Sequence, residues 1–417
     1  MGLGRILSRG RGAPPPAPAG PKAAPSGGQA RPAPPTTPGM ETYRDIAVVP
    51  PREFYANHLL VDGGPVWPDF DRANAARYRR NGRLIDRLPA APEGPVETIE
   101  TPCVWGGYAI RHFGHLVGEQ MTRLAVSVCE RPDDLYLFVL RPGEGPDAAP
   151  AAFWQIMEWY GIPRDRIRFV ERPLLCRELR VAAQGETLDT ARPTREHLDA
   201  LETVTARAGL APRAADTIYV TRAGMHARGQ GGFAGESYLT ALMPALGVPV
   251  LDPAATPLRA QLEAYAGARR IIFAEGSAIH GRQLLGRLDQ EIVVLKRRPW
   301  AELGYQMMSP RCRRALYMNV VEQVLPAQDK GGADVPPRAL SLYDTGLLFD
   351  VMRGMGLDLA PHWNDADYAR HMKDDAAAWI AAVRNDRIDR PLNPNVPVVR
   401  AGLARYGLQD LLGPPAR

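Results

Sequence analysis

Between residues 211 and 298 the sequence alternates short apolar runs with longer amphipathic ones, and this alternation constrains the fold more than any other feature. Four runs have the length and composition of buried strands: TIYVTR, VPVLD, RRIIFAEG and EIVVLKR. Three runs between them have the length of helices: GESYLTALMPALG, PLRAQLEAYAGA and SAIHGRQLLGRL. Strands joined by helices of this length pair in parallel, with the helices covering the sheet. The region therefore predicts an α/β domain.

A second series of the same kind precedes it, between residues 101 and 210. Here CVWGGYAI, DLYLFVL and RIRFVERP have the pattern of strands, whereas GHLVGEQMTRLAVSVCE and AAFWQIMEWYGI have the pattern of helices. A further helical stretch covers 194–209. A chain of 417 residues can bury two cores. We therefore predict two α/β domains in tandem, over 40–210 and 211–325.

The two ends of the chain differ from this pattern. Residues 1–39 are rich in Pro, Ala and Gly, with almost nothing to bury, and predict a disordered tail. After it, IAVVPP predicts a strand and DRANAARYRRNGRLIDRL predicts a polar helix. Residues 326–417 carry helical patterns at 339–356 and 365–384. They predict a helical extension whose packing the sequence leaves open.

Composition narrows the classes of function. Lys and Arg number 51 against 46 Asp and Glu, spread along the chain without a basic stripe, so no nucleic-acid partner is expected. Four scattered cysteines without a CxxC pair, and Asp-x-Asp triplets at 69–71 and 365–367 that follow no apolar strand, predict no metal site. No apolar run reaches the roughly 18 residues of a membrane span, and the N-terminus lacks a signal-peptide core. We expect a cytoplasmic protein, and peripheral contact with the inner face of the membrane stays open.

The first candidate site surrounds the end of the strand RRIIFA. Ligands of open parallel sheets bind beyond the carboxyl ends of the strands. Glu275, Gly276 and Ser277 follow this strand directly, and His280 lies one turn further on. Gly276 would let a ligand approach the backbone, and Ser277 could donate to a phosphate. The alternative is a plain turn in which Ser277 is the N-cap of the next helix.

A second candidate follows the strand TIYVTR. This strand ends in Arg222, and the glycine-containing loop after it carries Arg228. Two guanidinium groups at the carboxyl edge of a sheet suit a pyrophosphate, whose oxygens they can bind in pairs. Glu236 could hold an arginine or a ribose hydroxyl, or it is an ordinary first-turn helix acid. A solvated basic loop is the alternative for the two arginines.

A third candidate lies in the first domain, in RHFGHLVGEQMTRL. His115, Glu119 and Arg123 recur at four-residue steps and would share one face of a helix. Glu119 or His115 could then accept a proton from an attacking hydroxyl. An exposed ion pair between Glu119 and Arg123 is the alternative.

Taken in order, these segments resemble glycosyltransferase family 61, which includes enzymes of bacterial capsular polysaccharide synthesis. The resemblance covers about 101–298 and is carried by FGHLVGEQMTRL, WQIMEWYGIPRDRIRFV, IYVTRAGMHARG, Glu236, GVPVLDP, Gln261 with LEAYAGARRIIFAEGSAIH, and EIVVLKR. Thr221, Gly235 and Glu275 depart from the residues usual in the family. The resemblance implies a GT-B-like arrangement, in which two Rossmann-like domains face each other and the second binds the sugar nucleotide.

The same resemblance implies a function. It is transfer of a sugar from a nucleotide-sugar donor to a polysaccharide, another glycan or a lipid-linked glycan, with inversion and without a metal or cofactor. Glu275, Gly276 and Ser277 would form the donor rim, Arg222 and Arg228 would neutralise the diphosphate, and Glu119 or His115 would be the base. Two alternatives stay open: a sugar-nucleotide epimerase of similar architecture, and an inactive family member that acts as a scaffold in a polysaccharide or cell-surface assembly. The sequence specifies neither the sugar nor the acceptor.

Overall fold

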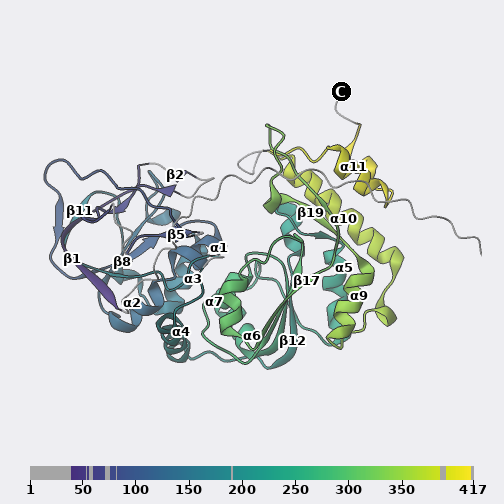
Figure 1. Cartoon of the computed structure of the whole chain (residues 1–417), viewed down its shortest axis with the longest axis horizontal. Helices are drawn as coiled ribbons and strands as arrows, with labels where there is room; N and C mark the ends of the chain where they lie inside the picture. Colours follow the sequence, from purple (N-terminus) through teal and green to yellow (C-terminus); the bar gives the residue numbers. More distant parts are fainter. Residues whose placement is uncertain are drawn as a thin grey trace, which may run out of the picture. The chain divides into compact units, whose positions relative to one another are not determined.

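The protein is described by a computed structural model over residues 39–52, 54–55, 60–70, 76–80, 82–188, 191–385 and 391–414. The tail expected over 1–39 lies outside these ranges, apart from Gly39. The chain from Thr37 to Arg417 forms one compact unit. It contains several sheets with parallel strands and helices packed on them, so the predicted α/β class is confirmed (Figure 1).

The first half of the unit is built on a seven-stranded sheet. Its strands follow the order β10-β9-β8-β11-β1-β4, and β7 pairs with β11. The bounds are β1 Met40–Val49, β4 Gly64–Pro65, β7 Glu97–Ile99, β8 Cys103–Tyr108, β9 Leu135–Val139, β10 Ile167–Phe169 and β11 Leu174–Ala182. The helices of this half are α1 Phe113–His115, the π-helical turn η1 Leu116–Gln120, α2 Leu124–Glu130, α3 Ala151–Tyr160 and α4 Arg195–Ala208.

Two predictions for this half are wrong. The sheet is not wholly parallel, because β1 runs antiparallel to β11, a strand that the sequence analysis missed. The helix predicted over 71–88 is absent from the described part of that segment, which instead forms the short antiparallel pair β5 Arg79–Arg80 and β6 Arg83–Leu84. The sequence Asn-Gly at 81–82 is a strong hairpin signal, and Gly82 has a φ of +71°. Local turn chemistry therefore outweighed the helix-forming residues around it.

The second half contains a five-stranded sheet in which all neighbouring strands are parallel. Its order is β14-β12-β15-β16-β17, which in chain order reads 2-1-3-4-5, an order typical of doubly wound sheets. The strands are β12 Ala215–Val220, β14 Val250–Leu251, β15 Ala268–Ala274, β16 Glu291–Lys296 and β17 Arg314–Asn319. The segments between them contain η4 Ala223–Arg228, α5 Glu236–Leu242, α6 Leu258–Gly267, α7 Ile279–Gln283 and α8 Tyr305–Met308.

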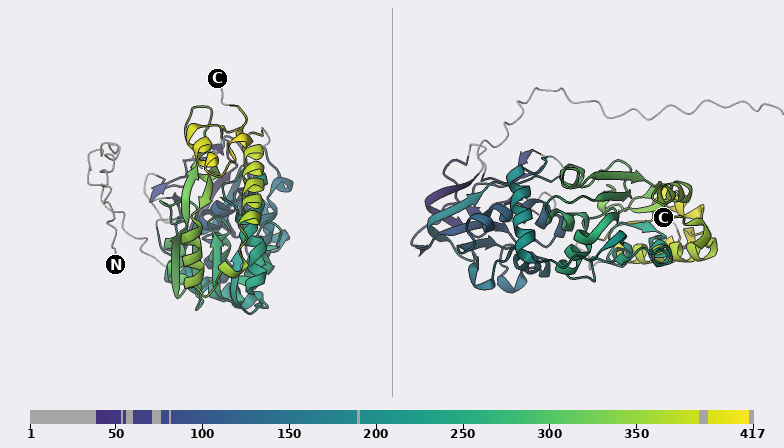
Figure 2. Two further views of the ribbon diagram at one scale, coloured as in Figure 1. Left: turned by 90° about the vertical axis from the view of Figure 1, so that its right-hand side faces the viewer. Right: turned by 90° about the horizontal axis from the view of Figure 1, so that it is seen from below.

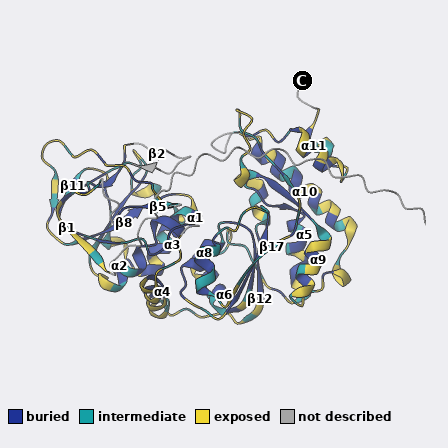
Figure 3. Ribbon diagram, viewed as in Figure 1, coloured by how far each residue is buried: buried dark blue, intermediate teal, exposed yellow. Residues whose placement is uncertain are grey.

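Both faces of this sheet are buried, and they belong to different cores. Along β15, Ile271 and Phe273 join the core that also fills the first sheet, whereas Ile272 and Ala274 join a second core. This alternation is the period-two pattern of a strand. In Figure 3 the inner strands of this sheet are largely dark blue, while much of the surface of α9 is yellow. A sheet that is covered on both sides leaves only its edges and strand ends for binding.

The described residues of the segment 326–414 pack on the second core. They contribute to a small sheet, β13-β19-β18, and to three helices that cover it. The bounds are β13 Phe233–Ala234, β18 Val321–Leu325, β19 Leu340–Tyr343, α9 Thr345–Gly354, α10 Asp365–Val383 and α11 Pro397–Ala404. Figure 2 shows this yellow end of the chain beside the green strands of the second half. Within the described residues, no helix is both long and apolar enough to cross a bilayer.

Candidate functional site

A cavity of about 420 Å³ opens at the carboxyl edge of the five-stranded sheet. Its walls come from the segments that follow three adjacent strands, β14, β12 and β15. In this strand order the chain leaves β12 toward one edge of the sheet and leaves β15 toward the other edge. Ligands of such sheets usually bind in the gap between these two strands. The first half closes one side of the cavity with Phe113, Ala152 and Gln155.

Arg222 lies at the centre of this edge. It follows β12, and its Nε donates to the carbonyl of Gly231 at 2.6 Å. A Cβ atom on Gly276 would clash with Nη1 of Arg222, so the glycine lets the guanidinium lie directly against the backbone after β15. Desolvation lowers the pKa of Arg222, and the negative charges of Glu236 and Glu275 partly offset this shift. Among the described residues no carboxylate forms an ion pair with Arg222, and the cation lines the cavity.

Arg228 ends η4 and lines the same cavity. Its side chain is exposed, and it too lacks an ion-pair partner in the part of the chain that the structure describes. Gly229, with a φ of +62°, ends this turn in the left-handed conformation. The two arginines that the sequence analysis singled out therefore meet at one cavity, both with their charge available to an anion.

Gly276 and Ser277 also line the cavity. Ser277 is not a helix cap: α7 begins at Ile279, its N-cap is Ala278, and no side chain caps it. The alternative in which Ser277 is the N-cap of the next helix is thus wrong. The serine side chain is half-buried at the cavity wall.

Glu236 and Glu275 do not line the cavity, although both were predicted to bind the donor. Glu236 is buried and accepts hydrogen bonds from the backbone N–H of Arg222 and from Thr221 Oγ1. Glu275 is buried, accepts from the backbone N–H of Arg297 at 2.9 Å, and pairs with the guanidinium of Arg298. Each carboxylate therefore fixes a loop at the sheet edge. Burial raises the pKa of Glu236 to about 7, despite the opposing effect of its bonds to Arg222.

In the first half, His115 and Glu119 do come together. Nδ1 of His115 lies 3.2 Å from Oε1 of Glu119, and Arg80 binds both oxygens of the same carboxylate. Burial alone would raise the pKa of Glu119, but the bonds and charges of His115 and Arg80 outweigh it, so the pKa is lowered. The carboxylate of Glu119 is fully buried, whereas a quarter of the His115 side chain is exposed.

The helix predicted for this segment is interrupted. Residues Leu116–Gln120 form a π-helical turn, closed by a bond from the N–H of Met121 to the carbonyl of Leu116. The extra residue changes the four-residue register, and Arg123 stacks on Tyr78 instead of pairing with Glu119. An exposed Glu119–Arg123 pair, the alternative considered above, is therefore wrong. π-turns of this kind occur frequently at functional sites.

Glycines bring this turn against the second half. A Cβ on Gly114 would lie 2.8 Å from His280 Cδ2 and 3.2 Å from Ser277 Cβ, closer than ordinary packing permits. A Cβ on Gly118 would lie 3.0 Å from Leu188 Cδ1 and 3.4 Å from Nδ1 of His280. Gly114 therefore brings the segment that carries His115 close to Ser277, but neither His115 nor Glu119 lines the cavity. His280 itself is buried beneath this contact and does not line the cavity.

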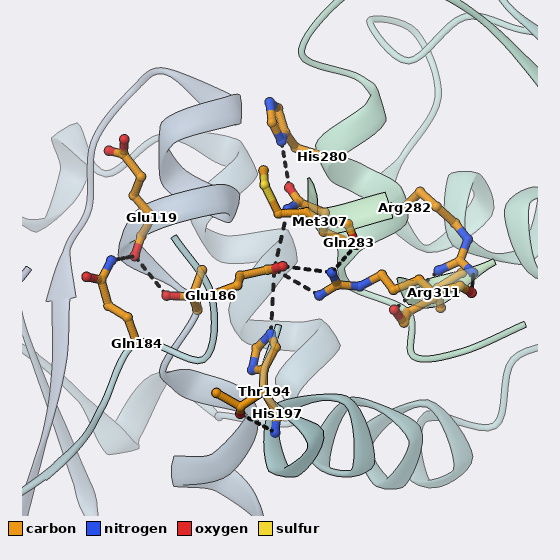
Figure 4. Close-up of polar contacts among 12 residues, drawn as sticks. Glu119, Gln184, Glu186, Thr194, His197, His280, Arg282, Gln283, Met307 and Arg311 are labelled. Atoms are coloured by element: carbon orange, nitrogen blue, oxygen red, sulfur yellow. Dashed lines mark hydrogen bonds and ion pairs between the residues drawn. The ribbon is translucent and has the colours of Figure 1, made fainter. Parts of the chain in front are cut away.

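His280 instead begins a buried polar network, drawn in Figure 4. Its Nδ1 lies 2.6 Å from Oε1 of Gln283, whose Nε2 donates to Glu186 at 3.3 Å. Glu186 accepts two bonds from Arg311, at 2.7 and 2.8 Å, and lies 3.6 Å from Nε2 of His197. Because Glu186 and Arg311 are paired and buried, this network holds the segments around the site rather than offering a group to a ligand.

A larger hollow, of about 960 Å³, lies beside β10 and α3. Two of its arginines already have partners within the protein: Arg168 pairs with Glu97, and Arg164 stacks on Trp154. We therefore place the candidate site at the smaller cavity, where the cations have no such partners. Within the described residues, no cluster of three His, Cys, Asp or Glu side chains could hold a metal ion.

Sequence reasoning missed Arg80, Glu186 and Arg311. Arg80 stands beside the Asn-Gly hairpin signal, which indicates its position but not its partner. Glu186 and Arg311 are 125 residues apart, and no local pattern links them.

A search of protein-family models returns no match to this chain, and a search of curated proteins returns none either. The function proposed below therefore rests on the geometry of the site.

Proposed function

We propose that the protein is a glycosyltransferase that uses a nucleotide-sugar donor and a glycan or lipid-linked glycan acceptor. The observation that carries this proposal is the cavity at the β12–β15 edge, where Arg222 and Arg228 converge without carboxylate partners. The doubly wound order of the second sheet, and a first α/β half that contributes to the same cavity, support a GT-B-like arrangement of two Rossmann-like halves.

The arginines supply the electrostatic part of the reaction. As the bond between the sugar and the diphosphate breaks, its electron pair goes to the phosphate oxygen, and negative charge grows on the leaving group. Preorganised cations at that position stabilise the transition state more than the ground state. Arg222 is preorganised by its bond to Gly231 and by its contact with Gly276. Two arginines here can do the work that a divalent cation does elsewhere.

The His115–Glu119 pair supplies the proton transfer. Glu119 is buried and held by Arg80, so it positions the imidazole, and His115 is the group exposed enough to meet an acceptor. Nδ1 of His115 is buried 3.2 Å from Oε1 of Glu119, so Nε2 would be the nitrogen that takes the proton from the acceptor hydroxyl. The acceptor oxygen then forms its bond to the anomeric carbon as the phosphate leaves from the opposite side, which inverts the configuration.

A thermal-shift screen tests the donor site. The purified protein is heated with nucleoside diphosphates and nucleotide sugars, since a ligand that binds only the folded state raises Tm. We expect a shift that depends on the base, that disappears in Arg222→Ala and that persists in Arg269→Ala. Arg269 is a matched control because it begins the same strand β15 at the opposite edge and pairs with Asp216. If no nucleotide shifts the Tm of well-folded protein, the inactive scaffold becomes the better explanation.

Turnover tests the chemistry separately. Release of nucleoside diphosphate from the donor is followed with and without glycan acceptors. His115→Ala and Glu119→Gln should lower kcat by about 100-fold or more while leaving donor affinity within about twofold. Equal loss of donor affinity and kcat would show that these residues support the fold of the cavity only. Turnover that ignores every acceptor, or that yields an isomer of the donor, would point to hydrolysis or to an epimerase.

A further inference from the structure

Asp252 is a carboxylate in a cavity otherwise marked by cations. It follows β14 directly, is half-buried and lines the same cavity as Arg222 and Arg228. Despite those neighbours it forms no ion pair with any described residue. Its Oδ1 accepts a bond from the N–H of Ala254 at 2.9 Å. Its Oδ2 faces the η4 turn, where a Cβ on Gly224 would lie 3.7 Å away.

Hydrogen bonds from Gln261 hold the loop that carries Asp252. Nε2 of this buried amide donates to the carbonyls of Pro253 and Thr256, at 3.1 and 2.7 Å. The N–H of Thr256 in turn donates to the carbonyl of Asp252 at 3.0 Å. The carboxylate is therefore fixed in place before any ligand arrives, although the structure gives Oδ2 no partner among the described residues. A carboxylate oxygen that is fixed at a cavity wall and has no protein partner can accept a hydrogen bond from a ligand.

The strand order fixes the order of the candidate binding residues along the edge of the sheet. β14, β12 and β15 are consecutive neighbours, spaced by about 4.8 Å. Asp252 stands at the end of β14, Arg222 at the end of β12, and Ser277 after β15, next to the His115 segment. A diphosphate is attracted to Arg222 and repelled by a carboxylate, so the charges favour its position over β12 rather than over β14. A ribose offers two adjacent hydroxyl donors, which a carboxylate can accept together.

We propose that Asp252 accepts the hydrogen bonds of the ribose hydroxyls, so that the donor lies with its nucleoside over β14, its diphosphate over β12 and its sugar over β15. This inference rests on the proposed function and adds to it the orientation of the donor. The orientation delivers the anomeric carbon to the Ser277 wall, which Gly114 of the first half approaches. Gln261 is a positioning residue, because it acts through the loop and not on the ligand.

Deoxy nucleotides test the inference. Affinities of the A, C, G and U nucleoside 5′-diphosphates are measured by calorimetry beside those of their 2′-deoxy and 3′-deoxy forms. For whichever base binds the wild type, we expect the ribose form to bind about tenfold tighter than either deoxy form, because each lacks one charge-assisted hydrogen bond. In Asp252→Asn, which keeps an oxygen for the N–H of Ala254, affinity for the ribose form should fall about tenfold and the ratio should drop to within about twofold.

Arg222→Ala is the matched control, since it should weaken the ribose and deoxy forms equally and preserve their ratio. An unchanged ratio in Asp252→Asn would overturn the inference. Tighter binding by Asp252→Asn would also overturn it, because the carboxylate would then only repel the diphosphate. These results would leave the proposed function standing, whereas wild-type protein that binds none of the nucleotides would overturn both.

Discussion

Arg222 and Arg311 are both cations with restricted access to water, yet they have opposite surroundings. Arg311 is fully buried and donates to both oxygens of Glu186. Arg222 is half-buried at a cavity, donates from Nε to a neutral carbonyl and forms no ion pair with a described carboxylate. A buried charge without a partner is expensive. The comparison indicates that Arg311 maintains the structure, and it agrees with the proposed role of Arg222, at the cavity, in binding an anion.

Glu186, which accepts from Arg311, and Glu236, which accepts from the backbone N–H of Arg222, show the same contrast. Burial favours the neutral form of both, but Arg311 and His197 overcome it at Glu186 and lower the pKa to about 2. At Glu236 burial prevails and raises the pKa to about 7. One oxygen of Glu236 has no hydrogen-bond partner among the described residues. The charge of Glu186 is thus balanced by its buried partners, whereas that of Glu236 is not.

The largest effect is expected from Arg311→Ala. Removing this cation leaves Glu186 buried without its main partner, which should lower the free energy of unfolding by about 3–5 kcal/mol. Urea denaturation measures the loss. Arg313→Ala is the control, because that side chain is more than half exposed and pairs with exposed Asp289 at 3.7 Å. The variant with both Glu186→Leu and Arg311→Met should recover much of the stability, and a loss no greater than the control would contradict the assignment.

A somewhat smaller effect is expected at Glu236, and it depends on pH. The folded pKa of about 7 lies above the ordinary value of 4.5. Protonation therefore favours the folded state, and this contribution, fully present below the unfolded pKa, is lost as pH rises toward about 7. The loss is about 3 kcal/mol. Glu236→Gln should remove that part of the pH dependence, measured as unfolding free energy between about pH 5 and about pH 8, whereas exposed Glu196→Gln should leave the wild-type profile.

Gly276→Ala tests whether the position of the Arg222 guanidinium matters, since the variant keeps the arginine and moves it. The added methyl would displace the end of the Arg222 side chain, which is flexible and can move at little cost in stability. We expect nucleotide affinity to fall about tenfold, or about 1.4 kcal/mol, with stability changed by less than about 1 kcal/mol. Gly354→Ala is the control, since a Cβ there meets no atom within 4 Å. Unchanged affinity in Gly276→Ala would mean that the position of the guanidinium does not matter.

The sequence predicted the second half of the molecule better than the first, for a physical reason. Between 211 and 298 each strand and helix is marked by its own local pattern, and strand ends of a parallel sheet meet at one edge. That rule alone placed Arg222, Arg228, Gly276 and Ser277 together. In the first half, the antiparallel pairing of β1 with β11 joins residues more than 120 positions apart, which no local pattern encodes.

The side chains that surround the site were harder to predict than the site itself. Glu119 and Arg80 are 39 residues apart, and they meet because a hairpin and a π-turn bring them together. Glu236 and Glu275 were placed correctly at the sheet edge, but their orientation toward backbone N–H groups instead of the cavity depends on packing. Periodicity gives the face of an element, whereas the direction of a polar side chain at a strand end depends on partners from elsewhere in the chain.

Arg228 offers the smallest and most discriminating change. Its side chain is exposed where that of Arg222 is half-buried, so its attraction for a diphosphate is weakened by solvent and salt. Arg228→Ala should weaken nucleotide binding only about fivefold at low ionic strength, and the difference from wild type should shrink toward nothing near 0.5 M salt. The loss caused by Arg222→Ala should persist under the same conditions, because water and ions reach its guanidinium less freely. Calorimetry at several salt concentrations measures both. If the two losses respond to salt alike, burial does not distinguish the arginines, and the contrast between a preorganised cation and a solvated one fails at this site.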